Sequence, residues 1–521
     1  MNEQKNILWV DDEINLLQPH IQYLKERGYE IDTSTNGIDA IDLIQHKNYN
    51  LILLDEMMPG KDGLATLTEI KALRPYLPVV MVTKNEEETL MEEAIGSMIA
   101  DYLTKPVNPS QILLVCKKFL EKKQILETQI SKEYLQEFNI ISQALMNPMN
   151  VDEWIELYKK ITLWQIQLDD HPQLGIQEML ADQIKECNSA FSKFVEQNYS
   201  TWINEKEKHK RPTLSHDVVE KSVVPLLEKN KSIFFIVVDC MRLDQWLLME
   251  RELHNLFQIS TEYYLSILPT ATPFSRNAIF SSLLPSDILK IYPEYWQGED
   301  GNETSYNKYE KELLQKYFDR KKITISPDLK YFKIHDKDFG RQLQQTINSY
   351  VTNKLTSIVI NFVDMLAHHR SDSMLLKEIA PDEAGYRSLT SSWFKHSSLL
   401  GMLQTLSKHK NVTIVLTTDH GSIRCFRGTK VIADRATSTS LRYKFGRNLK
   451  CDTKHSLFVK DPEQLKLPKS SFTENFIAAK EDYYFVYPTE YNKYLNQYRD
   501  SFQHGGISME EMILPIVTLS T

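Results

Sequence analysis

The sequence predicts an α/β protein of several domains with an all-α segment in the middle. Three observations support this fold class. The chain has 521 residues, which is too long for one hydrophobic core and suggests roughly three domains. Short apolar runs that end in Asp, His or Thr recur near both ends of the chain, as the buried strands of a parallel sheet do. Residues 107–220 contain one glycine, Gly175, and carry apolar residues at helical spacing instead.

The composition is that of a globular protein and argues against some classes of function. With 42% hydrophobic residues, 25% charged residues and a net charge of −9, broad electrostatic binding to nucleic acid is not expected. No apolar run approaches the roughly 18 residues that span a membrane. The N-terminus enters a strand pattern directly, so we expect no signal peptide and no membrane insertion. The five cysteines are scattered and lack CxxC spacing, which predicts a reducing compartment and a cytoplasmic protein.

The first 120 residues alternate predicted strands and helices. Helical spacing over 14–27 closes at Gly28. The predicted strands and the polar residues after them are Asn6–Val10 before Asp11 and Asp12, Leu51–Leu54 before Asp55, Val79–Val82 before Thr83, and Asp101–Leu103 before Lys105. Because the carboxyl ends of parallel strands meet at one edge of a sheet, we expect these polar groups to converge.

These side chains suit an aspartyl-phosphate site. Asp11, Asp12 and Asp55 supply the carboxylate oxygens that Mg²⁺ prefers. Asp55 can act as a nucleophile toward a phosphoryl group, while Lys105 offers a positive charge and Thr83 a hydroxyl to its oxygens. One acidic turn after a strand is common, but all of these groups at successive strand ends are not.

Residues 5–122 resemble the receiver domain of two-component response regulators, which has a flavodoxin-like fold. The resemblance implies that Asp55 is the phospho-acceptor and that Asp11 and Asp12 hold Mg²⁺. It also implies switch residues at Thr83 and Tyr102, and a phosphate-sensing Lys105 with a cis peptide to Pro106. A sensor histidine kinase and a phosphorylation-dependent homodimer are the implied partners. Lys84 departs from the family, which usually has a small residue there, and this departure bears on the dephosphorylation rate.

The middle of the chain is predicted to be a helical linker or bundle domain over 123–217. Apolar stripes at helical spacing run through it, and Pro148, Pro172 and Pro212 mark the breaks between helices. No helix-turn-helix is convincing, so no DNA-binding domain is evident. We expect this domain to couple the two ends of the chain.

The last 300 residues return to strands, several of which end in Asp or His. The strands and the residues near their ends are Ser232–Val238 with Asp239, Ser357–Phe362 with Asp364 and His368, Thr413–Thr417 with Asp419 and His420, and Ile513–Leu519 preceded by His504. An Asp-His pair alone is more often an ordinary turn. Six such residues, however, are enough to hold two metal ions.

The ligand types and a nearby loop indicate which chemistry these ions would serve. Mixed Asp and His sets suit Zn²⁺ or Mn²⁺ better than Mg²⁺ because imidazole is a borderline-soft ligand. The spacing of Asp364 and His368 places both on one face of a helix. Thr272 lies at the entrance of a helix expected to begin near Arg276, where its hydroxyl is a candidate nucleophile. Arg276 is a candidate for holding a phosphate oxygen.

Two motifs, Pro-Thr-Ala-Thr-Pro-Phe-Ser-Arg at 269–276 and His-Gly-Gly-Ile-Ser-Met-Glu-Glu at 504–511, resemble those of the PglZ domain of the alkaline-phosphatase superfamily. The resemblance implies an alkaline-phosphatase-like α/β domain in which Thr272, rather than Thr270, is the nucleophile. The implied metal ligands are Asp239, Thr272, Asp419 and His420 for one ion, and Asp364, His368 and His504 for the other. Ser275 stands where phosphodiesterase relatives have a transition-state-stabilising Asn, and Asn277 follows two residues later, so oxyanion stabilisation stays unassigned.

Receiver, helical linker and PglZ-type domain, expected at 1–122, 123–217 and 218–521, together resemble the PorX-type response regulators of type IX secretion. We hypothesise that phosphorylation of Asp55 controls a zinc-dependent phosphodiesterase. One threonine nucleophile without an arginine pair to clamp phosphate favours a diester, and nucleotide or oligonucleotide diesters are the hypothesised substrates. The alternative is a non-catalytic, metal-containing regulator that binds a transcription or secretion partner such as a sigma factor.

A group of aromatic residues lies between two of the metal motifs, in a predicted insertion. Its members are Tyr292, Tyr295, Trp296, Tyr306 and Tyr309. They could stack nucleic-acid bases, or they could simply pack the insertion. The sequence leaves both readings open.

Overall fold

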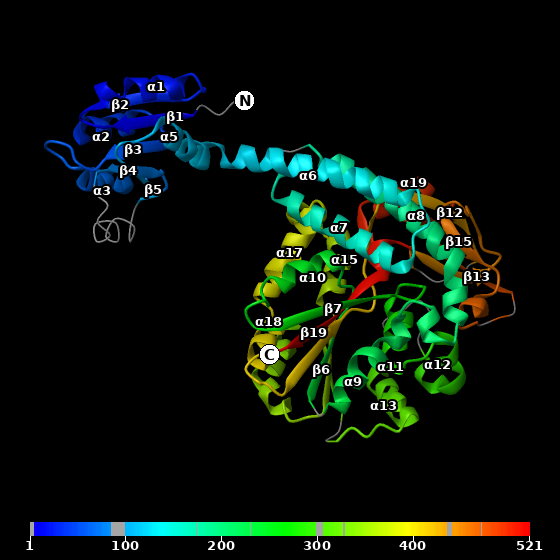
Figure 1. Ribbon diagram of the computed structural model, residues 1–521. Helices are drawn as coiled ribbons and strands as arrows, with labels where there is room; N and C mark the ends of the chain where they lie inside the picture. Colours follow the sequence, from blue (N-terminus) through cyan, green and yellow to red (C-terminus); the bar gives the residue numbers. More distant parts are fainter. Residues whose placement is uncertain are drawn as a thin grey trace. The chain divides into compact units, whose positions relative to one another are not determined.

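The computed structural model describes residues 5–84, 99–172, 175–229, 231–297, 306–326, 329–434, 440–469, 471 and 473–521. The chain divides into two compact units, Met1–Leu135 and Gln136–Thr521, and helix α6 (Lys122–Leu145) runs across this division. Each unit has its own sheet (Figure 1). Among the described residues, no helix combines the length and the apolar character needed to cross a membrane.

The first unit is a five-stranded parallel sheet in the order β2-β1-β3-β4-β5. This is the flavodoxin-like order, in which the strand order reverses beside β1. The strands are β1 (Asn6–Val10), β2 (Glu30–Ser34), β3 (Leu51–Asp55), β4 (Val79–Thr83) and β5 (Asp101–Thr104). The helices are α1 (Gln18–Lys25), α2 (Gly37–His46), α3 (Gly63–Leu73) and α5 (Pro109–Cys116). Because Val10 pairs with Leu54, the register sets Asp11 beside Asp55.

Three long helices follow the first sheet: α6, α7 (Val151–Asp169) and α8 (Gln177–Asn204). Asn150 begins α7 with a capping box, in which its side chain accepts from Glu153 N–H and Glu153 bonds back to Asn150 N–H. The breaks between these helices fall near Pro148 and Pro172, as predicted. In the second unit, α7 packs against α10 and α17 of the C-terminal fold (Figure 1).

The second unit is built on a six-stranded sheet in the order β7-β19-β10-β6-β9-β8. Its strands are β6 (Ser232–Val238), β7 (Gln258–Leu265), β8 (Lys330–Ile334), β9 (Leu355–Ile360), β10 (Val412–Thr417) and β19 (Ile513–Ser520). Strands β8, β9, β6 and β10 are parallel, whereas β19 is antiparallel to both β10 and β7. Every residue of β6, β9 and β10 is buried, as expected for central strands covered on both faces.

Helices cover this sheet, and smaller sheets extend it. The helices are α9 (Val224–Glu228), α10 (Leu243–Glu250), α11 (Thr272–Ser281), α12 (Pro285–Ile291), α13 (Glu310–Lys321), α14 (Lys337–Thr346), α15 (Phe362–Asp372), α16 (Met374–Ile379), α17 (Glu383–Lys395), α18 (Ser398–Leu406), α19 (Tyr491–Tyr498) and α20 (Met509–Met512). The remaining strands are β11 (Ile423–Cys425), β12 (Arg427–Ile432), β13 (Tyr443–Arg447), β14 (Lys450–Cys451), β15 (Ser456–Val459), β16 (Glu474–Ala479), β17 (Tyr483–Val486) and β18 (Ser501–Gln503).

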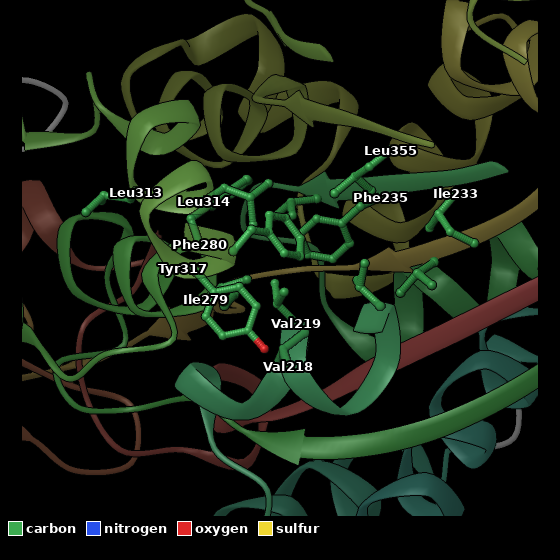
Figure 2. Packing of buried hydrophobic residues seen from close by; sticks show 14 of the residues in the cluster. Val218, Val219, Ile233, Phe235, Ile279, Phe280, Leu313, Leu314, Tyr317 and Leu355 are labelled. Carbon is green, nitrogen blue, oxygen red and sulfur yellow. The ribbon is translucent and has the colours of Figure 1, made fainter. Parts of the chain in front are cut away.

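The core of the second unit joins the central strands to α11 and α13. Phe235 of β6 packs against Phe280 of α11, with ring centroids 5.8 Å apart. Leu314 and Tyr317 of α13 belong to the same buried cluster (Figure 2). This packing fixes α11, whose first residue is Thr272, against the end of β6. The predicted α/β class, with a flavodoxin-like first unit and a helical middle, is confirmed.

Candidate metal and active sites

The residues predicted for the receiver site lie together at the carboxyl ends of β1 and β3. Carboxylate oxygens of Asp11, Asp12 and Asp55 lie within 4.8 Å of one another. Asp11 and Asp55 are buried, while Asp12 is exposed. Lys105 Nζ is 2.8 Å from Asp11 Oδ2 and 2.8 Å from Asp55 Oδ2. Such an all-oxygen group beside a single ammonium is suited to a hard divalent cation.

The switch residues predicted for the receiver occupy the next two strands. Thr83, at the end of β4, donates a hydrogen bond to the Glu56 carboxylate. Tyr102 on β5 is 40% exposed, and the peptide between Lys105 and Pro106 is cis, as predicted. Lys84 is exposed.

Burial and charge act in opposite directions on the receiver groups. Burial raises the pKa of Asp55 and the Asp11 charge adds to this, and the hydrogen bond from Lys105 offsets only part of the rise. Burial alone would lower the pKa of Lys105, but its hydrogen bonds to Asp11 and Asp55 raise that pKa above its usual value. The lysine is therefore held as a cation between the two buried carboxylates.

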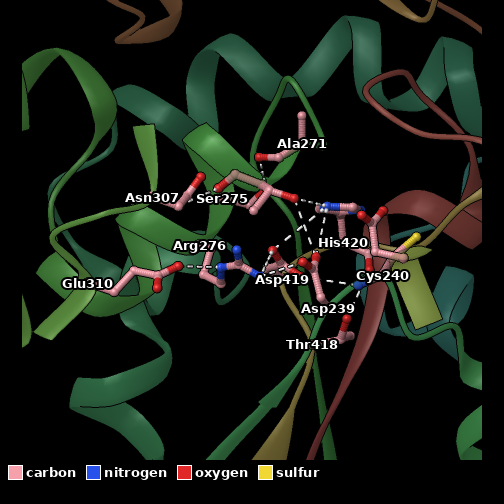
Figure 3. Close-up of polar contacts among 12 residues, drawn as sticks. Asp239, Cys240, Ala271, Ser275, Arg276, Asn307, Glu310, Thr418, Asp419 and His420 are labelled. Atoms are coloured by element: carbon pink, nitrogen blue, oxygen red, sulfur yellow. Dashed lines mark hydrogen bonds and ion pairs between the residues drawn. The ribbon is translucent and has the colours of Figure 1, made fainter. Parts of the chain in front are cut away.

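The first Asp/His group of the second unit forms where β6 and β10 end. Val237 pairs with Thr417, so Asp239 and Asp419 project at the same level of the sheet. His420 Nε2 lies 3.6 Å from Asp239 Oδ1 and 3.8 Å from Asp419 Oδ2 (Figure 3). All three of these ligand candidates are at most 2% exposed.

Hydrogen bonds around this group favour a bound cation. His420 Nδ1 lies 3.1 Å from Gly421 O, and since a carbonyl only accepts, Nδ1 carries the proton and Nε2 presents its lone pair. Cys240 N–H donates to Asp419 Oδ1 at 3.3 Å, while Asp419 Oδ2 is buried and accepts no hydrogen bond from the described residues. Asp419 Oδ2 and His420 Nε2 thus offer lone pairs that a cation could bind, and the residues present fit a metal ion.

Thr272 joins this first group. Its Oγ1 is 2.9 Å from His420 Nε2 and 3.4 Å from Asp239 Oδ1, and the residue is only partly buried. Helix α11 begins at Thr272, four residues earlier than expected, because Pro273 is favoured at the first position of a helix. Thr270, by contrast, is buried and bonded to the backbone of Gly505 and Gly506. The second hydroxyl of the loop is therefore the one near the ligands.

The second Asp/His group lies beside the first. Asp364 and His368 occupy one face of α15, with His368 Nε2 3.4 Å from Asp364 Oδ1, and His504 Nε2 is 3.6 Å from the same oxygen. The rings of His420 and His504 stack with centroids 4.3 Å apart. All six predicted Asp and His residues are therefore brought together at one edge of the sheet.

Electrostatics distinguish the two groups. Burial raises the pKa of Asp239 and of Asp419 and lowers that of His420, which keeps the imidazole neutral as a metal ligand must be. For Asp364, burial alone would raise the pKa, but the hydrogen bond with His368 and the nearby His504 lower it below its usual range.

Arg276 lies behind the first group, with its guanidinium held between carboxylates. Its Nη1 is 2.6 Å from Asp239 Oδ2 and 3.7 Å from Asp419 Oδ2, and its Nε donates to Glu310 Oε1 at 2.6 Å (Figure 3). The side chain is almost fully buried. That Arg276 contacts a phosphate oxygen stays a prediction. In the structure, its guanidinium binds the carboxylates of Asp239 and Asp419. Sequence reasoning missed Glu310, which opens an ordinary amphipathic helix and carries no local signal.

The residues at and near the position of the family's transition-state-stabilising asparagine already form hydrogen bonds within the protein. Ser275 Oγ donates to Ala271 O at 2.9 Å, and Asn277 Nδ2 donates to Tyr306 O at 3.0 Å. Asn307, which the sequence did not single out, donates to Thr272 O at 3.2 Å. Neither Ser275 nor Asn277 therefore presents its side chain to the site.

The aromatic residues of the predicted insertion contact one another. Trp296 lies 5.8 Å from Phe274 and 6.0 Å from Tyr306, centroid to centroid, and Tyr295 lies 5.2 Å from Tyr309. These contacts favour packing of the insertion over base stacking. Residues 298–305 lie outside the described residues.

Comparisons with known proteins assign families to three parts of the chain. A family model described as the BREX system PglZ alkaline phosphatase-like domain matches residues 218–519, more than half of the chain. The chain belongs to the PglZ family. Ahead of the PglZ domain, residues 7–117 match the response regulator receiver domain and residues 124–203 match the PorX response regulator linker domain. The predicted PorX-type arrangement is confirmed; the domain limits 1–122, 123–217 and 218–521 stay predictions.

Individual relatives match the receiver part. The transcriptional regulatory protein SrrA of Staphylococcus aureus is 34% identical over 128 residues, which are 25% of this chain and 53% of SrrA. The chain thus spans about half the length of the curated relatives it matches. Among solved structures, TrrA of Thermotoga maritima in complex with Mg²⁺ and BeF shares 34% identity over 22% of this chain and 100% of TrrA, with a TM-score of 0.21. The NtrX receiver domain of Brucella abortus shares 33% identity over 22% of this chain and 98% of its own, also with a TM-score of 0.21.

The family matches set the coarse function. A receiver domain ahead of a PglZ domain makes the chain a response regulator with a hydrolase-like domain. Receivers and alkaline-phosphatase-like domains generally bind metal ions, and three groups of described residues could hold one.

Proposed function

We propose that this PglZ protein is a response regulator whose phosphorylation on Asp55 controls a two-metal phosphodiesterase. The observation that carries the proposal is the adjacency of the two Asp/His groups, joined by the His420–His504 stack, with the Thr272 hydroxyl 2.9 Å from His420 Nε2. A nucleophile, two ligand groups and a partly open position are the parts that hydrolysis of a phosphate ester needs.

These contacts support the following ligand sets. One ion would be held by Asp239, Thr272, Asp419 and His420, and the other by Asp364, His368 and His504. Bound zinc or manganese ions would supply Lewis-acid stabilisation of the charge on the phosphoryl oxygens. Zinc is the proposed ion because each group contains imidazole.

The chain's own residues would act as follows. Thr272 gives up its hydroxyl proton to solvent and its Oγ forms a bond to phosphorus while the bond from phosphorus to the leaving alcohol oxygen breaks, and the departing alkoxide takes up a proton from solvent. Water then displaces Thr272 from phosphorus, which restores the hydroxyl. Arg276 holds Asp239 and Asp419 in place during both steps. Without an arginine pair at the described site to clamp a dianion, a diester is the proposed substrate class, nucleotide or oligonucleotide diesters in particular.

Regulation would begin in the receiver. A sensor histidine kinase phosphorylates Asp55, and the phosphorylated receivers form a homodimer through the surface that bears Tyr102. The PorX-type linker supports a role in type IX secretion, which belongs to the proposal together with the substrate and the metal.

The test is to measure metal content and hydrolysis of bis-p-nitrophenyl phosphate on the same samples, with and without chelator. We expect about two zinc ions per chain and turnover that chelator abolishes and zinc restores. Bound metal without turnover would contradict the proposed phosphodiesterase activity. Absence of metal after growth in zinc would contradict the ligand assignment.

A second candidate function is a non-catalytic, metal-containing regulator that binds a transcription or secretion partner such as a sigma factor. The engaged side chains of Ser275 and Asn277 favour it, because neither presents a donor for a developing oxyanion. Pull-down with a candidate sigma factor, using wild type and Thr272→Val, separates the two functions. Partner binding that survives this substitution while no diester is hydrolysed by wild type would favour the second candidate.

A further inference from the structure

Helix α8 of the linker hydrogen-bonds the loop that carries His504. Asn188 Oδ1 accepts from Met509 N–H at 2.8 Å, and its Nδ2 donates to the Glu510 carboxylate at 3.0 and 3.2 Å. One turn further along α8, Ser192 Oγ donates to Ile507 O at 3.2 Å. Asn188 and Ser192 are both buried. The loop between His504 and β19 is thus bonded, main chain and side chain, to a helix more than 300 residues earlier.

The same helix bonds the loop that carries Thr272. Tyr199 OH accepts from Leu268 N–H at 2.7 Å, four residues ahead of Thr272. Tyr199 is 1% exposed and Leu268 is fully buried. A buried backbone N–H without an acceptor is costly, so this hydroxyl is what lets Leu268 adopt its position.

Helix α7 reaches the third loop through buried ion pairs. Asp169 at the end of α7 accepts from Arg387 at 2.7 Å through both oxygens, and Arg387 also donates to Asp244 at 3.2 Å. Asp244 in turn binds Arg242, three residues after Asp239. The loops that carry Asp239, Thr272 and His504 therefore each have a link to α7 or α8, either direct or through one chain of ion pairs.

We propose that α7 and α8 form part of the active-site scaffold and that Asn188 and Tyr199 are positioning residues for the His504 and Thr272 loops. The proposal rests on the proposed function for its kinetic and zinc-binding readouts, whereas the amide-exchange readout is independent of it. Both residues touch backbone that carries a ligand or the nucleophile, and neither lies among the ligands. A displacement of about 1 Å in such a group can lower a rate by about a hundredfold, so a small movement of α8 would change catalysis without closing the site.

The experiment uses the full chain with Asn188→Ala and Tyr199→Phe. Matched controls are Asn198→Ala, whose side chain bonds only to Phe194 O within α8, and Tyr317→Phe, whose buried hydroxyl has no hydrogen-bond partner among the described residues. We expect kcat for bis-p-nitrophenyl phosphate to fall about ten- to a hundredfold in the test variants with little change in KM. We also expect Asn188→Ala to weaken zinc binding about tenfold and to speed amide exchange over 504–511, and Tyr199→Phe to speed exchange around Leu268.

A rescue variant separates positioning from general stability. Asn188→Asp sets a carboxylate against Glu510 and should lower zinc affinity and kcat, while Asn188→Asp combined with Glu510→Gln restores one donor and one acceptor across the contact. Recovery in the double variant supports positioning. Zinc affinity and exchange in Asn188→Ala equal to those of Asn198→Ala would overturn the proposal. If wild type binds zinc but hydrolyses nothing, the proposed function fails, while zinc affinity and amide exchange still decide the role of α8.

Discussion

The receiver site and the PglZ site gather carboxylates in the same way and neutralise them differently. In both, Asp residues follow the central parallel strands, β1 and β3 in one case and β6 and β10 in the other. The receiver balances its acids with Lys105, and leaves Asp12 exposed to solvent. The PglZ site buries its first group completely and balances it with Arg276, which Glu310 holds from behind.

This difference indicates which atom each site offers for chemistry. In the receiver the group consists of oxygens alone, so a hard cation fits and the carboxylate of Asp55 can itself accept a phosphoryl group. In the PglZ site Asp239 is held by the Arg276 guanidinium, imidazoles replace some of the oxygens, and the proposed reactive atom is the partly buried Thr272 hydroxyl. Under the proposed function, the cation beside the carboxylates, rather than the position at the strand edge, would decide whether a carboxylate or a hydroxyl reacts.

The largest expected effect tests whether Thr272 is that reactive atom. Thr272→Val removes the hydroxyl and keeps the shape, so we expect diester hydrolysis to fall about a thousandfold or more with zinc content retained. Thr413→Val is the matched control, since its buried hydroxyl on β10 accepts and donates no hydrogen bond among the described residues. Steady-state kinetics and metal analysis check both variants. Unchanged hydrolysis in Thr272→Val would show that another group is the nucleophile.

The corresponding change in the receiver tests Asp55. Asp55→Ala removes the carboxylate 2.8 Å from Lys105 Nζ, and we expect the acetyl-phosphate-driven shift from monomer to dimer to disappear entirely. Analytical ultracentrifugation with and without acetyl phosphate measures the shift. Asp32→Ala, in the same unit but outside the acidic group, should dimerise as wild type does. A dimer that forms equally in Asp55→Ala would end the switch hypothesis.

Deleting the cation in each site compares the two directly. Arg276→Met leaves buried carboxylates unbalanced and should lower the free energy of unfolding of the second unit by about 3–5 kcal/mol in the presence of chelator. Lys105→Met, where the cation is 13% exposed instead of almost fully buried, should cost the first unit less, about 1–3 kcal/mol. Urea unfolding followed by amide exchange of peptides from β3 and β6 measures each unit separately. Equal losses in the two units would show that burial of the cation does not distinguish the sites.

Strand ends were predictable because buried parallel strands are continuous apolar runs. Asn6–Val10 and Ser232–Val238 were predicted with the limits that the structure has. The strand predicted at Ser357–Phe362 instead spans Leu355–Ile360, because Phe362 begins α15 and its apolar side chain extends the pattern beyond the strand. Asp11 and Asp239 directly follow such runs, so these candidate ligands could be predicted from their positions, whereas His368 and His504 lie further from their strands.

The residues that hold the ligands could not be predicted from local pattern. Glu310 reaches Arg276 across 34 residues, and Asn188 reaches Glu510 across 322. Neither separation has a period that sequence spacing can detect. The available signal for Asn188 is a polar residue within an apolar stripe of α8, beside Cys187 and Phe191, and this signal does not say what the residue binds.

Glu510 extends the comparison to a carboxylate without a cation partner. It lies beside the PglZ site, and its hydrogen-bond partner is the amide of Asn188. Burial raises the pKa of Glu510 to about 7, against about 4.3 for Glu in an unfolded chain. The folded protein therefore holds this proton more tightly, and the resulting stability is complete below about pH 4 and is lost as the pH rises toward 7. Glu510→Gln should consequently be more stable than wild type at pH 8 by about 1–3 kcal/mol and equally stable at pH 4, as measured by urea unfolding.

Glu220, in the same unit, is expected to show the opposite dependence of stability on pH. Burial would raise its pKa, but hydrogen bonds from Lys208 and Lys321 lower it below the usual value, so ionised Glu220 stabilises the fold above the unfolded pKa and this contribution is lost as the pH falls. Glu220→Gln should therefore be less stable than wild type at pH 8, by less than about 1 kcal/mol because the ion pairs are partly exposed. If Glu510→Gln and Glu220→Gln change the free energy of unfolding at pH 8 in the same direction, the hydrogen-bond partner of a carboxylate, whether a cation or an amide, does not set its protonation in this domain.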